Sequence, residues 1–117
     1  LLFEEGESGA LLAAVHAVKY GLRIFDHILT GLTIVVHPSW QGRGLGKALF
    51  TAFLRTLEAS RPDIRRVELE SRASNTRSIG LYQSLGFVPE GVLRNKTRNA
   101  DGSFEDSLLM AWTAPEG

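Results

Sequence analysis

The segment Gln41-Gly42-Arg43-Gly44-Leu45-Gly46-Lys47 places three glycines between a strand pattern at residues 27–37 and a helix pattern at residues 45–57. At the start of a helix, unpaired backbone N–H groups and the positive end of the helix dipole favour an anion. Arg43 and Lys47 add positive charge. The segment therefore predicts a phosphate-binding loop. A glycine cluster alone is equally typical of a plain loop with a close helix approach.

Two well-known glycine loops do not match this segment. A Walker loop would need glycine at position 41 and a hydroxyl at position 48, where the chain has Gln41 and Ala48. The dinucleotide fingerprint would need glycine at position 47 or 49, where Lys47 and Leu49 stand. The phosphate must then belong to a different class of ligand.

The periodicity of apolar residues on either side of this loop predicts the order β-β-β-α-β-α-β-β. The strands are expected at residues 1–5, 10–20, 27–37, 67–72, 91–98 and 103–112, and the helices at residues 45–57 and 75–85. A strand, a helix and a strand in succession predict a parallel pair joined by a right-handed crossover, whereas the terminal hairpins are antiparallel. The fold class is therefore α/β (α+β): a mixed, mainly antiparallel sheet with a central parallel pair and two flanking helices.

Particular side chains are expected at set places in these elements. One parity of the third strand carries the residues expected on its buried face: Ile28, Thr30, Leu32, Ile34 and Val36. The buried stripe of the first helix is expected to be Leu45, Ala48, Leu49, Ala52, Phe53 and Leu57. Gly86 is expected to end the second helix in a left-handed conformation, with Phe87 making the hydrophobic contact that accompanies such a cap.

Composition limits the classes of partner. The chain has 117 residues, which suits one domain, and 13 basic residues balance 13 acidic ones, so no net field attracts nucleic acid or an anionic membrane. It has no cysteine, and its apolar stretches are too short to span a bilayer. We expect a soluble, cytoplasmic protein. Its three dispersed histidines predict no metal site.

Two motifs in this order resemble the GCN5-related N-acetyltransferase (GNAT) superfamily. Ile34-Val35-Val36-His37-Pro38 followed by the glycine segment is similar to the family's Q-x-x-G-x-G motif. Downstream, Asn75, Ser78, Leu81-Tyr82 and Gly86-Phe87 are similar to its N-x-x-A-x-x-L-Y-x-x-x-G-F motif. The resemblance implies a single GNAT-like domain that transfers the acetyl group of acetyl-CoA, its cosubstrate, to a primary amine of a small molecule or protein by direct attack on the thioester.

The resemblance also implies how acetyl-CoA is held. Its pyrophosphate would rest on the backbone N–H groups of residues 42–47, and its pantetheine arm would lie where the strands ending near Val36 and Ser71 splay apart. A backbone N–H near Val36 would stabilise the oxyanion. The expected cofactor-binding residues are Ile34, Val35, Val36, Gln41, Gly42, Arg43, Gly44, Leu45, Gly46, Lys47, Asn75 and Tyr82.

Two residues are expected to be catalytic. Glu70 lies in a segment very similar to that of the ribosomal-protein alanine N-acetyltransferases, in which the matching glutamate is the proton acceptor; it could equally be a solvated charge on a strand. His37 or a water chain are the other candidate bases. Tyr82 resembles the tyrosine that donates a proton to the coenzyme A sulfur, and also suits aromatic packing. Asn75 would cap the second helix or contact the cofactor.

The chain departs from the family at its start, where the usual first strand and two helices have no counterpart. We therefore expect an N-terminally truncated chain whose shortened sheet tends to self-associate, for example as a homodimer. Two functions stay open, an acetyltransferase and a noncatalytic acyl-CoA-binding or interaction module. The acceptor also stays open among a protein N-terminus, a polyamine, an antibiotic and another small amine.

Overall fold

The computed structural model describes residues 2–4, 11–36 and 44–115. Within these ranges the predicted order of strands and helices is confirmed, with one short 3₁₀ helix added between the second and third strands. The bounds are β1 (Leu2–Glu4), β2 (Leu11–Val18), η1 (Arg23–Phe25), β3 (Ile28–Val36), α1 (Leu45–Ser60), β4 (Arg66–Arg72), α2 (Thr76–Ser84), β5 (Val88–Arg98) and β6 (Phe104–Thr113).

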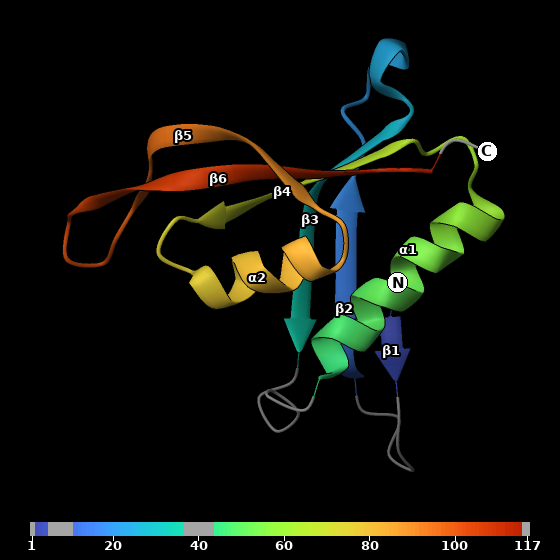
Figure 1. Cartoon of the computed structure of the whole chain (residues 1–117), viewed down its shortest axis with the longest axis horizontal. Helices are drawn as coiled ribbons and strands as arrows, with labels where there is room; N and C mark the ends of the chain where they lie inside the picture. The colour runs from blue at the N-terminus through green and yellow to red at the C-terminus, as the bar shows by residue number, and fades with distance from the viewer. Residues whose placement is uncertain (1, 5–10, 37–43, 116–117) are drawn as a thin grey trace.

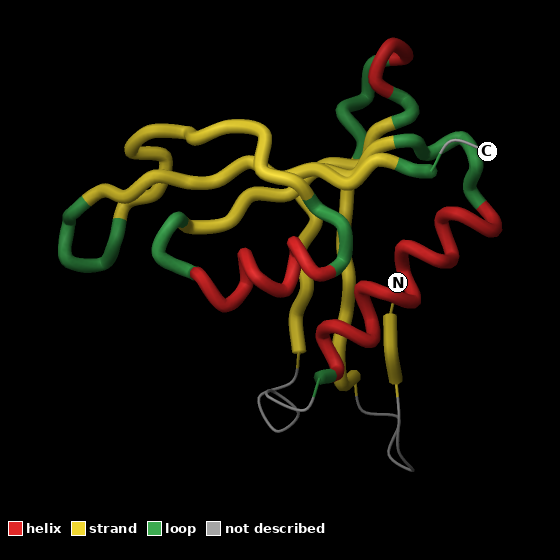
Figure 2. Tube along the Cα trace, in the orientation of Figure 1, coloured by secondary structure: helices red, strands yellow, loops and turns green. Residues whose placement is uncertain are grey.

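The strands that the structure describes form one mixed sheet in the order β1-β2-β3-β4-β6-β5. Neighbours are antiparallel except for β3 and β4, which are parallel as predicted. The connections through α1 and α2 advance in the same direction across the sheet, and right-handed crossovers then place both helices on one face. Figures 1 and 2 show this arrangement. We call this side the helix face and the opposite side the open face.

β3 and β4 separate soon after they begin. Their register consists of two pairs, Ile28 with Arg66 and Leu29 with Val67, although β3 continues to Val36. In Figure 1 the two strands leave their common start in different directions. From Thr30 onward, the edge of β3 that faces β4 has no strand partner in the described part of the chain. The expected splay between these strands is therefore present.

A bulge at Gly31 changes which side chains of β3 face the core. His16 pairs with Thr33 and Val18 with Thr30, so β3 has one more residue than β2 between these pairs. Gly31 takes φ 64°, a left-handed conformation that glycine adopts without a steric penalty. The expectation that Ile28, Thr30 and Leu32 share one face is therefore wrong, although Ile28 and Leu32 are both buried, each 7% exposed. Leu29, which pairs with Val67 of the core, replaces Ile28 and Thr30 on the helix face.

The hydrophobic core lies between the sheet and the two helices. Leu49, Phe50, Val67, Leu69 and Met110 are almost completely buried there. The stripe expected for α1 is confirmed in part: Leu49 and Leu57 are buried and Phe53 packs against the core. Ala48 is exposed, and Phe50 and Leu54, which were not expected in the stripe, are buried. The helix is oriented so that leucine and phenylalanine face the sheet, because burying these larger side chains removes more apolar area from water than burying alanine does.

Local capping fixes both ends of α2 as predicted. The side chain of Asn75 accepts a hydrogen bond from the backbone N–H of Ser78 at 3.2 Å. At the other end, Gly86 has φ 98°. Phe87 is buried in the core, and its backbone N–H donates to the carbonyl of Tyr82 at 3.0 Å. These contacts set the helix at a fixed place on the sheet, which positions Tyr82.

The edge strand β5 begins three residues earlier than the residue 91 expected from sequence, at Val88, and it includes Pro89. Proline is tolerated at an edge because its missing N–H removes no bond that the sheet needs. Farther along, the register shifts between Leu93 and Thr97, and Asn95 takes φ 53°. This bulge is stabilised by a 2.9 Å bond from the Asn95 N–H to the carboxylate of Asp106.

Alanine substitutions of one buried and one exposed phenylalanine test the assignment of the hydrophobic core. Phe50 is completely buried and Phe104 is 59% exposed. Phe50→Ala should lower the free energy of unfolding by about 3–5 kcal/mol, because it removes a large side chain and leaves a cavity. Phe104→Ala is the matched control and should change it by no more than about 0.5 kcal/mol. Urea denaturation followed by fluorescence measures both, and equal losses would contradict this assignment of the core.

Candidate functional site

The start of α1 has an open donor end. Its N-cap is Gly44 in a left-handed conformation, and no side chain within the described ranges caps the helix there. The first turn of α1 contains no acidic residue, and Lys47 is exposed. Such an end presents backbone N–H groups and positive dipole charge to an anion. Gln41, Gly42 and Arg43 lie outside the described residues, as does His37; Leu45 begins the helix and Gly46 is half-buried.

The edge of β3 offers a second set of backbone groups. Val35 and Val36 pair with Ala14 and Ala13 of β2. On the opposite edge, alternate residues of β3 direct N–H and C=O groups into the splay, because a strand presents these groups to each side in turn. Extended backbone of this kind can pair with the amide groups of a linear ligand. Ile34 packs against the hydrophobic core and so holds this part of the strand in place.

A cavity of about 470 Å³ lies in the splay. Its open-face wall includes Glu70 and Leu109, which pair in register on β4 and β6. Leu32 and Leu69 also line it, and these two side chains belong to the core on the helix face. No described residue of α1 or α2 lines the cavity, so it is an opening on the open face between the diverging strands, with Leu32 and Leu69 at its floor.

Glu70 stands on this wall with its carboxylate accessible. Its side chain is 43% exposed, and its Oε1 lies 3.8 Å from Nζ of Lys96, which the β5 bulge carries toward it. An exposed pair at this distance contributes little energy and separates readily. The Glu70 carboxylate is therefore accessible from the cavity.

Tyr82 lies on the helix face, opposite Glu70. Its ring contacts Phe50 with centroids 5.5 Å apart and Phe87 at 6.1 Å. Burial raises the pKa of the Tyr82 hydroxyl, and a hydrogen bond with Ser78 opposes this only in part. The phenol therefore keeps its proton through the neutral range. Tyr82 is not among the residues that line the cavity; the structure brings Glu70 to the cavity and packs Tyr82 between α1 and the sheet.

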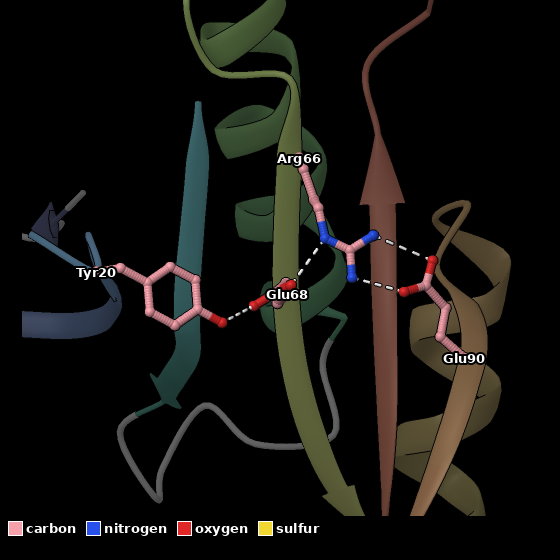
Figure 3. A network of polar contacts seen from close by, with 4 residues as sticks. All are labelled: Tyr20, Arg66, Glu68 and Glu90. Atoms are coloured by element: carbon pink, nitrogen blue, oxygen red, sulfur yellow. Dashed lines mark hydrogen bonds and ion pairs between the residues drawn. The ribbon is translucent and has the colours of Figure 1, made fainter. Parts of the chain in front are cut away.

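Four polar residues of the open face form a network that the sequence did not predict (Figure 3). The hydroxyl of Tyr20 donates to Oε1 of Glu68, and Nε of Arg66 donates to Oε2 of Glu68 at 2.8 Å. Arg66 also holds both carboxylate oxygens of Glu90, at 3.1 and 2.6 Å. The alternation of charged and apolar residues along β4 places Arg66 and Glu68 on one face, but nothing in that pattern identifies Tyr20 or Glu90 as partners.

The network changes the ionisation of Glu68. Burial alone raises the pKa of this carboxyl, but hydrogen bonds from Tyr20 and Arg66 together outweigh burial and hold the pKa below its usual range. Hydrogen bonds from Arg66 likewise lower the pKa of Glu90. Both carboxylates are therefore charged at neutral pH, and Arg66 lies between them.

Among residues 2–4, 11–36 and 44–115, no group of three or more histidine or carboxylate side chains is placed to share a metal ion. Neither α1 nor α2 is long and apolar enough to cross a membrane.

Comparison with known proteins gives a consistent result. The family model "Acetyltransferase (GNAT) family" matches residues 3–87. The [ribosomal protein bS18]-alanine N-acetyltransferase of Escherichia coli (strain K12) is 40% identical over 82 residues, which cover 70% of this chain and 53% of that protein. The mycothiol acetyltransferase of Beutenbergia cavernae is 38% identical over 93 residues, 79% of this chain and 29% of that protein. The chain thus spans about half the length of the first of these curated relatives and less of the second.

Solved structures show the same likeness. A GNAT-family acetyltransferase from Streptococcus pneumoniae superposes with a TM-score of 0.84 at 28% identity, covering 92% of this chain and 62% of that one. The ribosomal-protein-S18-alanine N-acetyltransferase from Escherichia coli superposes with a TM-score of 0.78 at 33% identity, covering 100% of this chain and 70% of that one.

The lowered pKa of Glu68 predicts a pH-dependent stability difference. Its charged form favours the folded state, so this contribution is complete above the unfolded carboxyl pKa of about 4.3 and is lost as the pH falls through the lower folded value. At pH 7, Glu68→Gln should lower the free energy of unfolding by about 1–3 kcal/mol.

The difference in the free energy of unfolding between wild type and Glu68→Gln should become smaller below a pH of about 4.3. There Glu68 of the wild type becomes neutral, as the glutamine of the variant is at every pH. Urea denaturation at pH 7 and pH 3.5 measures this difference. Glu58→Gln, an exposed change on α1, is the control and should stay within about 0.5 kcal/mol of wild type at both values. A gap that stays constant or widens in acid would contradict the assignment.

Proposed function

Because this chain belongs to the acetyltransferase (GNAT) family, we propose that it transfers the acetyl group of acetyl-CoA to a primary amine by direct attack of the amine on the thioester. The observation that carries this proposal is the cavity between β3 and β4. It opens beside the accessible carboxylate of Glu70, so an amine can approach the parted strands from the open face.

Acetyl-CoA would occupy the helix side of this opening. The pyrophosphate would contact the uncapped N–H groups at Gly44, Leu45, Gly46 and Lys47, together with Gln41, Gly42 and Arg43. The pantetheine arm would pair with the free edge of β3 at Ile34, Val35 and Val36. Asn75 would act mainly through its cap on α2, since its side-chain oxygen already accepts from Ser78.

The amine would enter from the open face. Glu70 would accept a proton from the protonated amine, directly or through water, which exposes the nitrogen lone pair. The nitrogen then forms the new C–N bond at the thioester carbonyl carbon, the C–S bond breaks, and the departing sulfur takes the proton of the Tyr82 hydroxyl. The extra proton on the new amide nitrogen leaves through water and restores the Tyr82 hydroxyl. The raised pKa of Tyr82 keeps the hydroxyl proton available at neutral pH. A backbone N–H near Val36 would stabilise the oxyanion.

The first acceptor class to test is the α-amine of a protein N-terminus. The relative at 40% identity is named for acetylating an alanine of ribosomal protein bS18. An α-amine has a pKa of about 8, whereas a lysine side chain has a pKa of about 10.4, so an α-amine needs less help from a base at neutral pH. Alanine-initiated peptides are therefore the first substrates to use.

Calorimetry with acetyl-CoA and a thiol-release assay test the function together. We expect micromolar binding of acetyl-CoA, much weaker binding of S-acetylpantetheine, which lacks the pyrophosphate, and thiol release with an alanine-initiated peptide. Binding without thiol release across α-amines, polyamines and small amines would identify a noncatalytic acyl-CoA-binding module. Absence of heat with acetyl-CoA from folded protein would refute the proposal.

Replacing Glu70 separates a catalytic base from a solvated charge. Glu70→Gln should lower kcat/KM by a factor of about 10²–10⁴ at neutral pH, because the amide cannot accept the proton. The loss should diminish at high pH, where the amine is already neutral. Glu58→Gln on α1 serves as the control with unchanged activity, and an undiminished rate in Glu70→Gln would assign Glu70 to the solvated surface.

Replacing Tyr82 tests the proton donor. Tyr82→Phe keeps the ring contacts with Phe50 and Phe87 but removes the hydroxyl. We expect kcat to fall by a factor of about 10² and the Kd for acetyl-CoA to stay within about twofold. Stopped-flow turnover and calorimetry measure the two quantities. An unchanged kcat would leave Tyr82 with a packing role only.

A further inference from the structure

The open face carries a chain of side-chain contacts that joins parts of the sheet remote from each other in sequence. We call Tyr20, Glu68, Arg66 and Glu90 the polar strap. Tyr20 follows β2, Glu68 and Arg66 belong to β4, and Glu90 belongs to β5. Since β3 lies between β2 and β4, and β6 lies between β4 and β5, the strap passes over two strands. Figure 3 shows the Tyr20 side chain crossing β3 and the Arg66 side chain reaching over β6.

The strap lies where the sheet has little main-chain bonding. β3 and β4 share two register pairs, at Ile28 and Leu29, before they separate. The hydrogen bond from Tyr20 to Glu68 joins the segment after β2 to β4 across that seam. A side-chain bond therefore complements backbone bonds at the base of the cavity.

Glu68 has no spare oxygen for proton transfer. It is 8% exposed, and its two oxygens accept from Tyr20 and from Arg66. A buried carboxylate is stable only when it is paired in this way, and removing one partner leaves the charge poorly compensated. Although Glu68 lines the cavity beside Glu70, its contacts suit it to hold Tyr20 and not to act as a base.

Tyr20 presents a fixed but accessible ring to the same cavity. It lines the cavity, is 49% exposed, and packs against Phe25 with ring centroids 5.3 Å apart. Its hydroxyl bond to Glu68 restrains the ring at this position. A rigid aromatic ring offers contact area to a ligand at little cost in conformational entropy.

From these contacts we propose that Tyr20 is a specificity-determining residue that forms one wall of the acceptor site, and that the rest of the polar strap holds it there. This inference rests on the proposed function, because the acceptor amine is what would occupy the open-face side of the cavity. Tyr20 selects acceptors by contact with the groups next to the reacting amine, while Glu68, Arg66 and Glu90 are positioning residues.

The polar strap predicts that Tyr20→Phe raises the acceptor KM and leaves kcat nearly unchanged. Tyr20→Phe keeps the ring contact with Phe25 but loses the bond to Glu68, so the ring is more mobile and each binding event must order it further. The acceptor KM should therefore rise by a factor of about 3–10, the equivalent of one net hydrogen bond. The kcat and the Kd for acetyl-CoA should stay within about twofold, because the strap touches neither the start of α1 nor Tyr82.

The experiment compares Tyr20→Phe, Glu90→Gln, the double variant and Asp63→Asn, using an alanine-initiated peptide as acceptor. Glu90 does not line the cavity. If Glu90→Gln raises the acceptor KM, the substitution must therefore affect Tyr20 through Arg66 and Glu68. The increase in the double variant should be smaller than the product of the single increases, as expected for residues in one network. Asp63→Asn breaks the exposed pair with Arg61 away from the cavity and should leave KM unchanged.

Hydrogen exchange of the protein without substrates tests the strap independently of catalysis. Peptides covering residues 19–27 should exchange several-fold faster in Tyr20→Phe and Glu90→Gln than in wild type or Asp63→Asn. If wild type acetylates no amine, the proposed function fails, and the exchange rates alone decide whether the strap exists. An unchanged acceptor KM in Tyr20→Phe overturns the role in specificity, and unchanged exchange in both strap variants overturns the strap.

Discussion

The brief parallel contact between β3 and β4 is the constraint on which the rest of the structure depends. Two register pairs bring Ile28 and Leu29 beside Arg66 and Val67, and beyond them the strands part. If β3 and β4 paired along their whole length, the cavity would be closed and the backbone N–H and C=O groups on the edge of β3 would be hydrogen-bonded to β4. The fold must therefore hold an incomplete sheet together by other means.

Packing on the helix face and polar contacts on the open face share that task. On the helix face, Tyr82 of α2 contacts Phe50 of α1 and Phe87, so aromatic side chains join the two helices above the seam. On the open face, hydrogen bonds and ion pairs from Tyr20 through Glu68 and Arg66 to Glu90 span the same region. The first set is insensitive to salt and pH, whereas the second responds to both.

Sequence patterns predicted most of the fold because they are local. Apolar periodicity placed the strands and helices, and Asn75 and Gly86 marked the ends of α2. The pattern failed at Gly31, where one inserted residue reverses the parity of β3, since periodicity assumes an unbroken strand. It identified Glu70 as a candidate, and the structure places this residue on the cavity. It did not identify Tyr20 or Glu90, because their partners depend on strand order, which is a long-range property.

The outer edge of β5 has a further consequence for how this protein behaves in concentrated solution. Pro89 interrupts the row of backbone donors, and the bulge around Asn95 bends the strand away from a flat course. A foreign strand approaching this edge would lack a continuous ladder to extend, so edge-to-edge pairing through β5 is discouraged. The protein can thus leave the long edge strand β5 in water without offering a template for fibre growth.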